Sequence, residues 1–300
     1  CDVQGHGDSD HGGRFHGWNR SAELALEAFS AGNGIFAAVP KYALGHSFGG
    51  VLTALELAKP TYLGRDGQVL PEDAPGEQVA ESVYDIRIKP GIRYQPHPAF
   101  ATDDAGRLRY HALRPGELGA RRSPLDFEHS GTRELVAEDY VYAFKRFADP
   151  ANKSAVWSYL EEFGIVGLNA QRDKALKEKK PFDYDAPVAG LRAPDRFTFE
   201  MRLEKPRPSL PYLLASGDLF GAVAREVVEH YGDSIEAHPV GTGPFKLAQW
   251  RRASLIVLER NPGHRERYFE ATPAADDAEG QALLAKFKGR RLPMVDRVEV

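Results

Sequence analysis

The chain has 300 residues, 42% of them apolar and 27% charged, which is enough to bury a core and to form two domains. Its formal net charge of −4 gives no basic field, so nucleic acid is excluded as a partner. The sequence has no apolar run of membrane-spanning length, and residues 1–30 contain no signal-peptide core. A single cysteine, Cys1, excludes a disulfide framework and a thiolate zinc site.

The stretch YALGHSFGGVL contains a G-x-S-x-G pentapeptide centred on Ser47. Such a pentapeptide forms a nucleophile elbow where a strand enters it and a helix leaves it. Residues 37–44 give a short apolar approach, and the apolar residues within 51–57 are spaced as one face of a helix. Residues 1–50 therefore resemble the middle of an α/β-hydrolase. The resemblance implies Ser47 as the nucleophile and the backbone N–H of Phe48 as an oxyanion donor.

A serine hydrolase also needs a histidine base, an acid that orients the base, and a second oxyanion donor. No histidine after residue 58 lies in a hydrolase-like context, so the triad is incomplete. We expect binding rather than catalysis and leave enzyme activity open. The spacing of His6, His11 and His16 fits neither face of a helix nor a strand, so no metal site is expected.

From residue 81 onward the patterns alternate between strands and helices. The expected elements are two strands joined by a tight turn (81–95), a helix (133–150), a strand that turns into a short apolar helix (195–215), a helix closed by Gly232 (224–232), and a glycine loop with two strands (238–262). Helices inserted between strands predict a mixed α/β or α+β fold with more than one sheet.

Four of these segments resemble landmarks of the family 5 extracytoplasmic solute-binding proteins. They read YDIRIKPGIRYQ, VAEDYVYAFKRFADP, FTFEMRLEKP and PVGTGPFKLAQW followed by IVLERNP. The resemblance covers about residues 51–300 and implies part of a two-lobed, periplasmic-binding-protein type II-like fold. It divides the chain into a hydrolase-like fragment (1–50), a first-lobe region (51–263) and a truncated start of the second lobe (264–300). The seam between the two resemblances falls between 48 and 58.

As the resemblance implies, the chain is the substrate-binding component of an ABC importer for peptides or similar small solutes. The implied partners are that solute and ABC permease subunits, the implied location is periplasmic or extracytoplasmic, and no cofactor is implied. We expect Gly241, Thr242 and Gly243 near the ligand, because glycines let a backbone approach closely. Phe245 and Trp157 are candidate aromatic contacts, with a place in the core as the alternative for each.

Two incomplete resemblances in one chain predict a truncated or chimeric reading frame. Since the sequence starts with Cys1 and not with Met, we expect it to begin inside a longer frame; a lipidated N-terminus at Cys1 is the alternative. Two other functions stay open: a serine esterase or related hydrolase that uses Ser47, and a remnant that neither binds nor catalyses.

The fold prediction places residues 59–260 in one α/β unit, with residues 1–50 packed loosely against it or apart from it. The predicted core consists of Tyr84, Ile86, Ile88, Tyr140, Phe144, Phe199, Leu203, Phe245 and Val257.

Overall fold

The computed structural model describes residues 42–43, 55–110, 127–207, 209–210, 214, 220–232, 235, 238–251 and 253–300. Its largest sheet has seven strands: β1 (Tyr42–Ala43), β2 (Leu55–Leu57), β3 (Thr61–Leu63), β4 (Val69–Leu70), β5 (Glu81–Ile88), β6 (Leu191–Asp195) and β7 (Thr198–Leu203). Strand β5 pairs with β2 and β3 along one edge and with β7 along the other, and all of these pairs are antiparallel. The mixed α and β composition that the sequence predicts is confirmed.

Along the central strands β5 and β7, buried side chains alternate with more exposed ones, which gives the sheet one buried face. In β5 the residues Ser82, Tyr84, Ile86 and Ile88 are buried, and in β7 every second residue from Phe199 onward is buried. Successive side chains of a strand point to opposite faces, so one face of the sheet becomes apolar. That face needs a covering layer.

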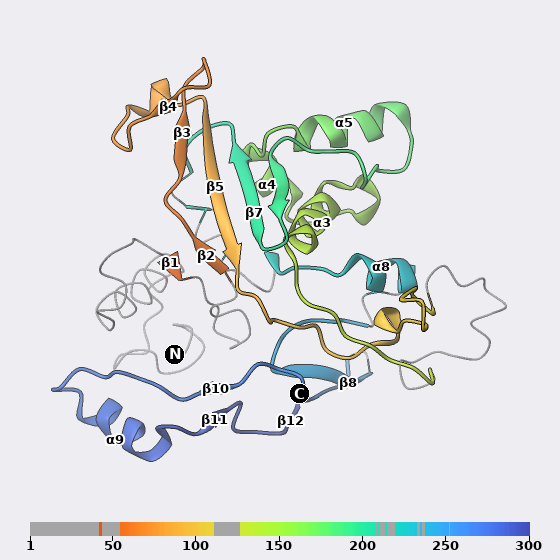
Figure 1. The fold of residues 1–300 in the computed structure, drawn as a ribbon, viewed down its shortest axis with the longest axis vertical. Coiled ribbons are helices and arrows are strands. Elements are labelled where there is room, and N and C mark those ends of the chain that lie inside the picture. Colours follow the sequence, from red (N-terminus) through yellow and green to blue (C-terminus); the bar gives the residue numbers. More distant parts are fainter. Residues whose placement is uncertain are drawn as a thin grey trace.

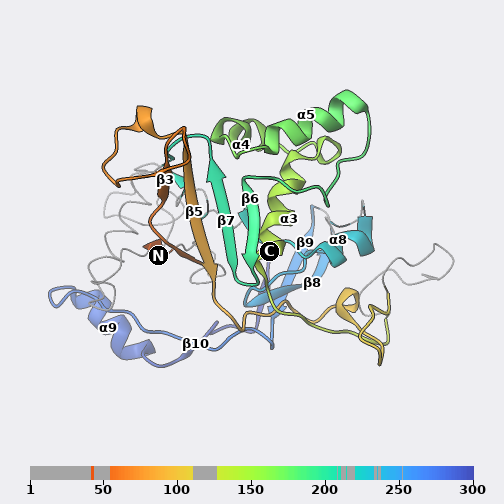
Figure 2. The same cartoon turned by 45° about the horizontal axis from the view of Figure 1, so that its top comes forward.

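Three helices form that layer: α3 (Ala137–Ala148), α4 (Trp157–Phe163) and α5 (Leu168–Glu178), which lie on one side of β6 and β7 (Figures 1 and 2). Ring packing joins helix to sheet, with Phe144 stacked on Phe199 at 5.7 Å and Tyr140 on Phe199 at 5.9 Å between ring centroids. Helix α3 begins where the Asp139 carboxylate accepts the Val136 N–H at 3.0 Å.

Short elements complete this part of the chain. They are the 3-10 helices η2 (Gly76–Gln78), η3 (Pro98–Phe100) and η5 (Pro150–Asn152), and the helix α8 (Arg225–Tyr231). The expected helices 133–150 and 224–232 are thus confirmed as α3 and α8. The expected hairpin over 81–95 is wrong in its second half, because the residues after Gly91 pair with the segment near Glu134 and not with β5.

The C-terminal part forms two small sheets. One contains β8 (Phe245–Arg251), β9 (Leu255–Arg260) and β12 (Arg297–Glu299), and the other contains β10 (Arg267–Tyr268) and β11 (Arg291–Leu292), between which lies α9 (Ala278–Phe287). None of the residues 265–300, all of which the structure describes, is buried. This part therefore adds little to the core.

The predicted core is confirmed except at two positions. Tyr84, Ile86, Ile88, Tyr140, Phe144, Phe199 and Leu203 belong to one buried cluster. Val257 is buried but lies on β9 in the separate three-stranded sheet. Phe245 is only partly buried, because it begins β8 at the edge of that sheet. The prediction of core burial for Phe245 is therefore wrong.

The described residues near the serine elbow do not follow the hydrolase pattern. Residues 55–57, expected within the helix after the elbow, form strand β2, whose Leu55 is buried against the sheet. Tyr42 and Ala43 pair antiparallel with β2, so these two residues lie on the sheet edge and not apart from it. Ser47 and Phe48 lie outside the described residues. Within the described chain, no helix has the length and apolarity to cross a membrane.

Candidate functional site

A glycine loop, residues 240–244, leads into β8 and is held from two sides. The Gly241 carbonyl accepts a hydrogen bond from the Gln95 N–H at 2.9 Å. The Gly243 carbonyl accepts one from Asn261 Nδ2 at 2.9 Å, and the Pro244 carbonyl accepts one from the Asn261 N–H at 2.8 Å. Gln95 follows β5 and Asn261 follows β9, so the loop bridges the large sheet and the three-stranded sheet. Both anchoring side chains are buried.

This loop also has hydrogen-bond donors without a partner in the described chain. Among the residues that the structure describes, the N–H groups of Thr242 and Gly243 and the Thr242 hydroxyl have no partner. Both residues are partly exposed. Because unpaired backbone donors are costly unless water or a ligand satisfies them, the loop is ready to receive acceptor oxygens.

Packing does not require glycine at these positions. A Cβ on Gly241 or on Gly243 would come no closer than 3.9 Å to described atoms, and neither residue has a positive φ. At Gly131, by contrast, a Cβ would collide with the Phe100 carbonyl. The open space beside the loop glycines is what a closely approaching ligand backbone needs.

Arg133 lies beside the segment that carries Gln95, where its carbonyl accepts the Tyr94 N–H. Its guanidinium forms paired hydrogen bonds with Asp139 (2.6 and 2.8 Å) and with Glu226 (2.6 and 2.7 Å). The same group lies over the rings of Tyr94 and Phe100, at 5.0 and 5.4 Å from their centroids. Burial opposes its charge, but the bonds to both carboxylates keep the Arg133 pKa above its ordinary value.

Two cavities of about 410 and 430 Å³ have Arg133 and Glu226 in their walls. The Arg133 charge is already matched by the two carboxylates, so it is not available as an anchor for an anionic ligand. Residues 241–245 line neither cavity. The glycine loop therefore lies outside both cavities, while the Arg133 cluster joins α3 to α8 through Asp139 and Glu226.

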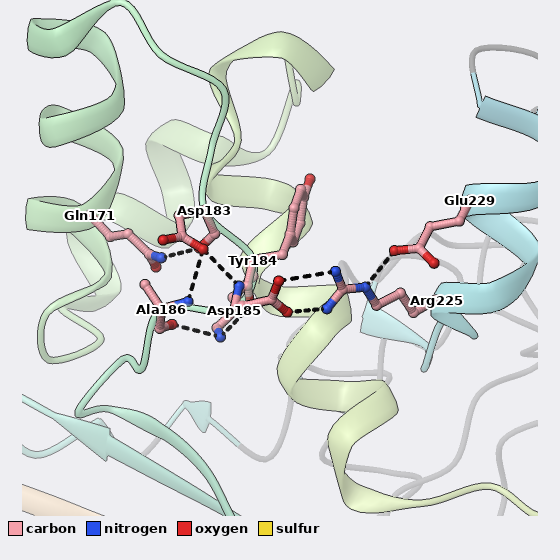
Figure 3. A network of polar contacts seen from close by, with 8 residues as sticks. Gln171, Asp183, Tyr184, Asp185, Ala186, Arg225 and Glu229 are labelled. Atoms are coloured by element: carbon pink, nitrogen blue, oxygen red, sulfur yellow. Dashed lines mark hydrogen bonds and ion pairs between the residues drawn. The ribbon is translucent and has the colours of Figure 1, made fainter. Parts of the chain in front are cut away.

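A second polar network positions helix α8. Figure 3 shows Arg225 of α8 between Asp185 and Glu229, with hydrogen bonds to both carboxylates. The loop that carries Asp185 is fixed in turn by Gln171 of α5, which donates to the Asp183 carbonyl, and by Lys145 of α3, which donates to the Tyr184 and Ala186 carbonyls at 2.9 Å. Helix α8 is thereby tied to the helical layer.

A comparison with family models then identifies the chain. The model of the bacterial extracellular solute-binding proteins, family 5 Middle, matches residues 129–300, which is more than half of the sequence. The chain belongs to this family. The match includes the glycine loop and Asn261, and it does not extend to Gln95 or to the serine elbow.

Similar proteins are found among curated solute-binding proteins. The periplasmic oligopeptide-binding protein OppA of Salmonella typhimurium is 37% identical over 130 residues, which cover 43% of this chain and 22% of the relative. The probable deoxycholate-binding periplasmic protein YgiS of Escherichia coli is 33% identical over 139 residues, covering 46% and 24%. The matched stretch thus spans less than a quarter of each relative.

Among solved structures, the OppA of Burkholderia pseudomallei is 21% identical, with 68% of this chain and 32% of that one covered and a TM-score of 0.41. Membership of the family 5 solute-binding proteins rests on the sequence match.

Within this family 5 chain, the predicted site residues do not form one site. Gly241, Thr242 and Gly243 share the loop described above, and Phe245 follows it as the first residue of β8. Trp157 is only 8% exposed, begins α4, and packs in the core cluster under Arg172 at 4.7 Å. Figures 1 and 2 show α4 in the helical layer beside the large sheet and β8 away from it, in the C-terminal part. Trp157 is thus a core residue in this structure.

Gln95, Asn261 and Arg133 were missed by the sequence patterns. The Asn-Pro dipeptide at 261–262 indicates a turn, and this was the only signal for Asn261. Nothing in the sequence pairs Gln95 with Gly241. Within the described residues, no group of three or more His, Cys, Asp or Glu side chains is placed to hold a metal ion.

Proposed function

We propose that the chain is the substrate-binding component of an ABC importer, and that its glycine loop contacts a peptide or a similar small solute. This proposal rests on the glycine loop: the N–H groups of Thr242 and Gly243 have no partner among the described residues, and the loop lies within the segment that matches the family. An extended peptide offers carbonyl oxygens at regular spacing, which such donors bind in the manner of an added strand.

The names of the relatives support this ligand class and widen it. The OppA relatives are named for binding oligopeptides and YgiS for deoxycholate. Both kinds of molecule carry carboxylate or carbonyl acceptors, which suits a loop of N–H donors. Peptides are the proposed ligands, and deoxycholate is the second compound to test. The proposal includes an extracytoplasmic location and docking to ABC permease subunits, as in the rest of the family.

Titration calorimetry with tri- to pentapeptides tests the proposal through Gly243→Ala. The added methyl group fits the folded loop but occupies the space beside it, so peptide affinity should fall about 10-fold or more with unfolding unchanged. Gly76→Ala is the matched control, because that glycine also has open space and no positive φ. Equal affinities of the wild type and Gly243→Ala would contradict the proposal, as would the absence of binding.

The proposed division of the chain leaves a separate expectation for Ser47. If residues 1–50 act as a hydrolase fragment, the protein should hydrolyse p-nitrophenyl acetate and lose this activity in Ser47→Ala. We expect no turnover above background, since residues 55–57, at the end of the stretch where the helix is required, form β2. A ligand-induced upward shift of a cooperative unfolding transition would argue against a functionless remnant.

A further inference from the structure

Three histidines and a tyrosine lie together beside the glycine loop. His97 is buried, and its Nδ1 accepts the Ala99 N–H at 3.1 Å. The proton of the neutral ring therefore lies on Nε2, which donates to the Tyr231 hydroxyl at 2.8 Å. This bond joins the segment before η3 to the end of α8.

The Tyr231 ring carries the contact onward to the loop. It stacks on His238 with 3.9 Å between centroids and 6° between planes. His230 packs edge-on to Tyr231 at 4.7 Å and to His97 at 6.0 Å. His238 is the third residue before Gly241, so the stack fixes the chain that enters the glycine loop.

These contacts close a ring through the chain. Gln95 binds the Gly241 carbonyl, and His97, two residues after Gln95, reaches His238 through Tyr231. The loop is thus held at Gly241 and again at His238 by one short segment. Loss of the His97 contact would remove the second point of attachment.

Charge makes this arrangement sensitive to acid. Burial and the nearby His230 and His238 lower the pKa of His97 to about 3, and burial and His230 lower the pKa of His238. Other described groups that contact the cluster include the Phe100 ring beside His97, the Phe127 ring beside His230, and the Tyr110 carbonyl, which lies 3.2 Å from His230 Nδ1. A single imidazolium ion is stabilised by a cation–π contact with the Tyr231 ring, but two imidazolium ions in the cluster would repel each other.

We propose that the His97–Tyr231–His238 contact is an acid-sensitive latch that holds the glycine loop on Gln95 and releases it when the histidines take up protons. Protonated His97 cannot accept the Ala99 N–H, and the nearby His230 and His238 oppose a positive charge on its ring. Acid therefore favours the state in which Gly241 leaves Gln95. Acid should also weaken solute binding, an expectation that rests on the function proposed above.

Amide hydrogen exchange followed by NMR tests the latch without any ligand. The Gln95 N–H binds Gly241, whereas the Tyr94 and His97 N–H groups of the same segment bind the Arg133 and Gly131 carbonyls. If one histidine regains its ordinary pKa of about 6.5 on opening, the open state gains about 25-fold between pH 7 and pH 5. The protection factor of Gln95 should fall by about that amount, and those of Tyr94 and His97 should stay within about 3-fold.

Two variants sharpen the test. His97→Gln keeps a donor for Tyr231 but cannot take up a proton, so the protection of Gln95 should lose most of its pH dependence. His129→Gln changes a histidine with a 44% exposed side chain outside the cluster and should behave as the wild type. If the protection factors of the Gln95 and Tyr94 amides in the wild type change in parallel at every pH, the proposal is overturned. This result does not depend on whether the His97→Gln variant folds. So would an unchanged pH dependence in His97→Gln.

Discussion

The large sheet with its helices and the C-terminal part of the chain are stabilised in different ways. Around β5, β7 and α3 the structure has one continuous buried cluster of apolar side chains. From residue 245 to the end, the buried residues of the described chain are Val257, Asn261 and His264, two of which are polar. Apolar packing therefore holds the first region, and hydrogen bonds hold the glycine loop between the two.

The largest effect should come from the ring stack of the first region. Phe199→Ala removes a fully buried ring that packs on Tyr140 and Phe144, so the free energy of unfolding should fall by about 4 kcal/mol. Ile256→Ala changes a side chain that is 37% exposed in the second region and should cost less than about 1 kcal/mol. Urea unfolding measures both. Equal losses would remove the contrast between the two regions.

The Arg133 cluster should come next. Arg133→Met leaves the carboxylates of Asp139 and Glu226 facing each other without their cation, at a cost of about 3 kcal/mol. Adding Glu226→Gln should recover part of this loss, which a double-mutant cycle in urea can measure. Arg196→Met is the control, since that side chain is 60% exposed and pairs with Glu134 at the surface. A loss below 1 kcal/mol in Arg133→Met would mean that the cluster is not structural.

His264 predicts an acid dependence for the second region. Burial and three nearby arginines lower its pKa from 6.5 to about 4. The unfolded chain therefore binds the proton more tightly, and the stabilisation present above pH 6.5 is lost as the pH falls toward 4, by about 2 kcal/mol. Unfolding of wild type and His264→Leu at pH 7 and pH 4 should show a smaller pH effect in the variant. The same pH effect in both proteins would contradict this assignment.

The smallest expected effect concerns Asn261, which holds the glycine loop from the side of the three-stranded sheet. Asn261→Ala removes the donor to the Gly243 carbonyl and should cost about 1 kcal/mol. The change should also lower the hydrogen-exchange protection of the backbone N–H at position 261, while that of the Ile88 N–H stays unchanged. Asn169→Ala, which removes a surface bond to the Glu161 carbonyl, is a matched amide deletion. Equal exchange profiles of the two variants would show that Asn261 does not hold the loop.

Local periodicity predicted the elements of the first region well, but it did not predict the long-range pairings. The alternation of β5 and the helical spacing of α3 are set by neighbours in sequence, and both elements are observed. The return strand after Pro90 was wrong, because residues 92–95 find their partners near Glu134 and at Gly241. Such long-range pairing leaves no periodic signal.

The contacts of individual site residues were likewise not predictable from local sequence. A large aromatic ring fits a core and a binding cleft equally well by sequence, and the structure places Trp157 in the core. The glycine loop could be named from its composition, but its anchors at Gln95 and Asn261 depend on how two sheets meet.

Peptide binding at the glycine loop is tested most directly by an NMR titration of the backbone amides with pentapeptides. If the loop binds peptides, the signals of Thr242 and Gly243 shift in a saturable manner, while those of Tyr84 and Ile86 in the buried sheet do not move. Saturable peptide binding that leaves the Thr242 and Gly243 signals unchanged would contradict binding at the loop.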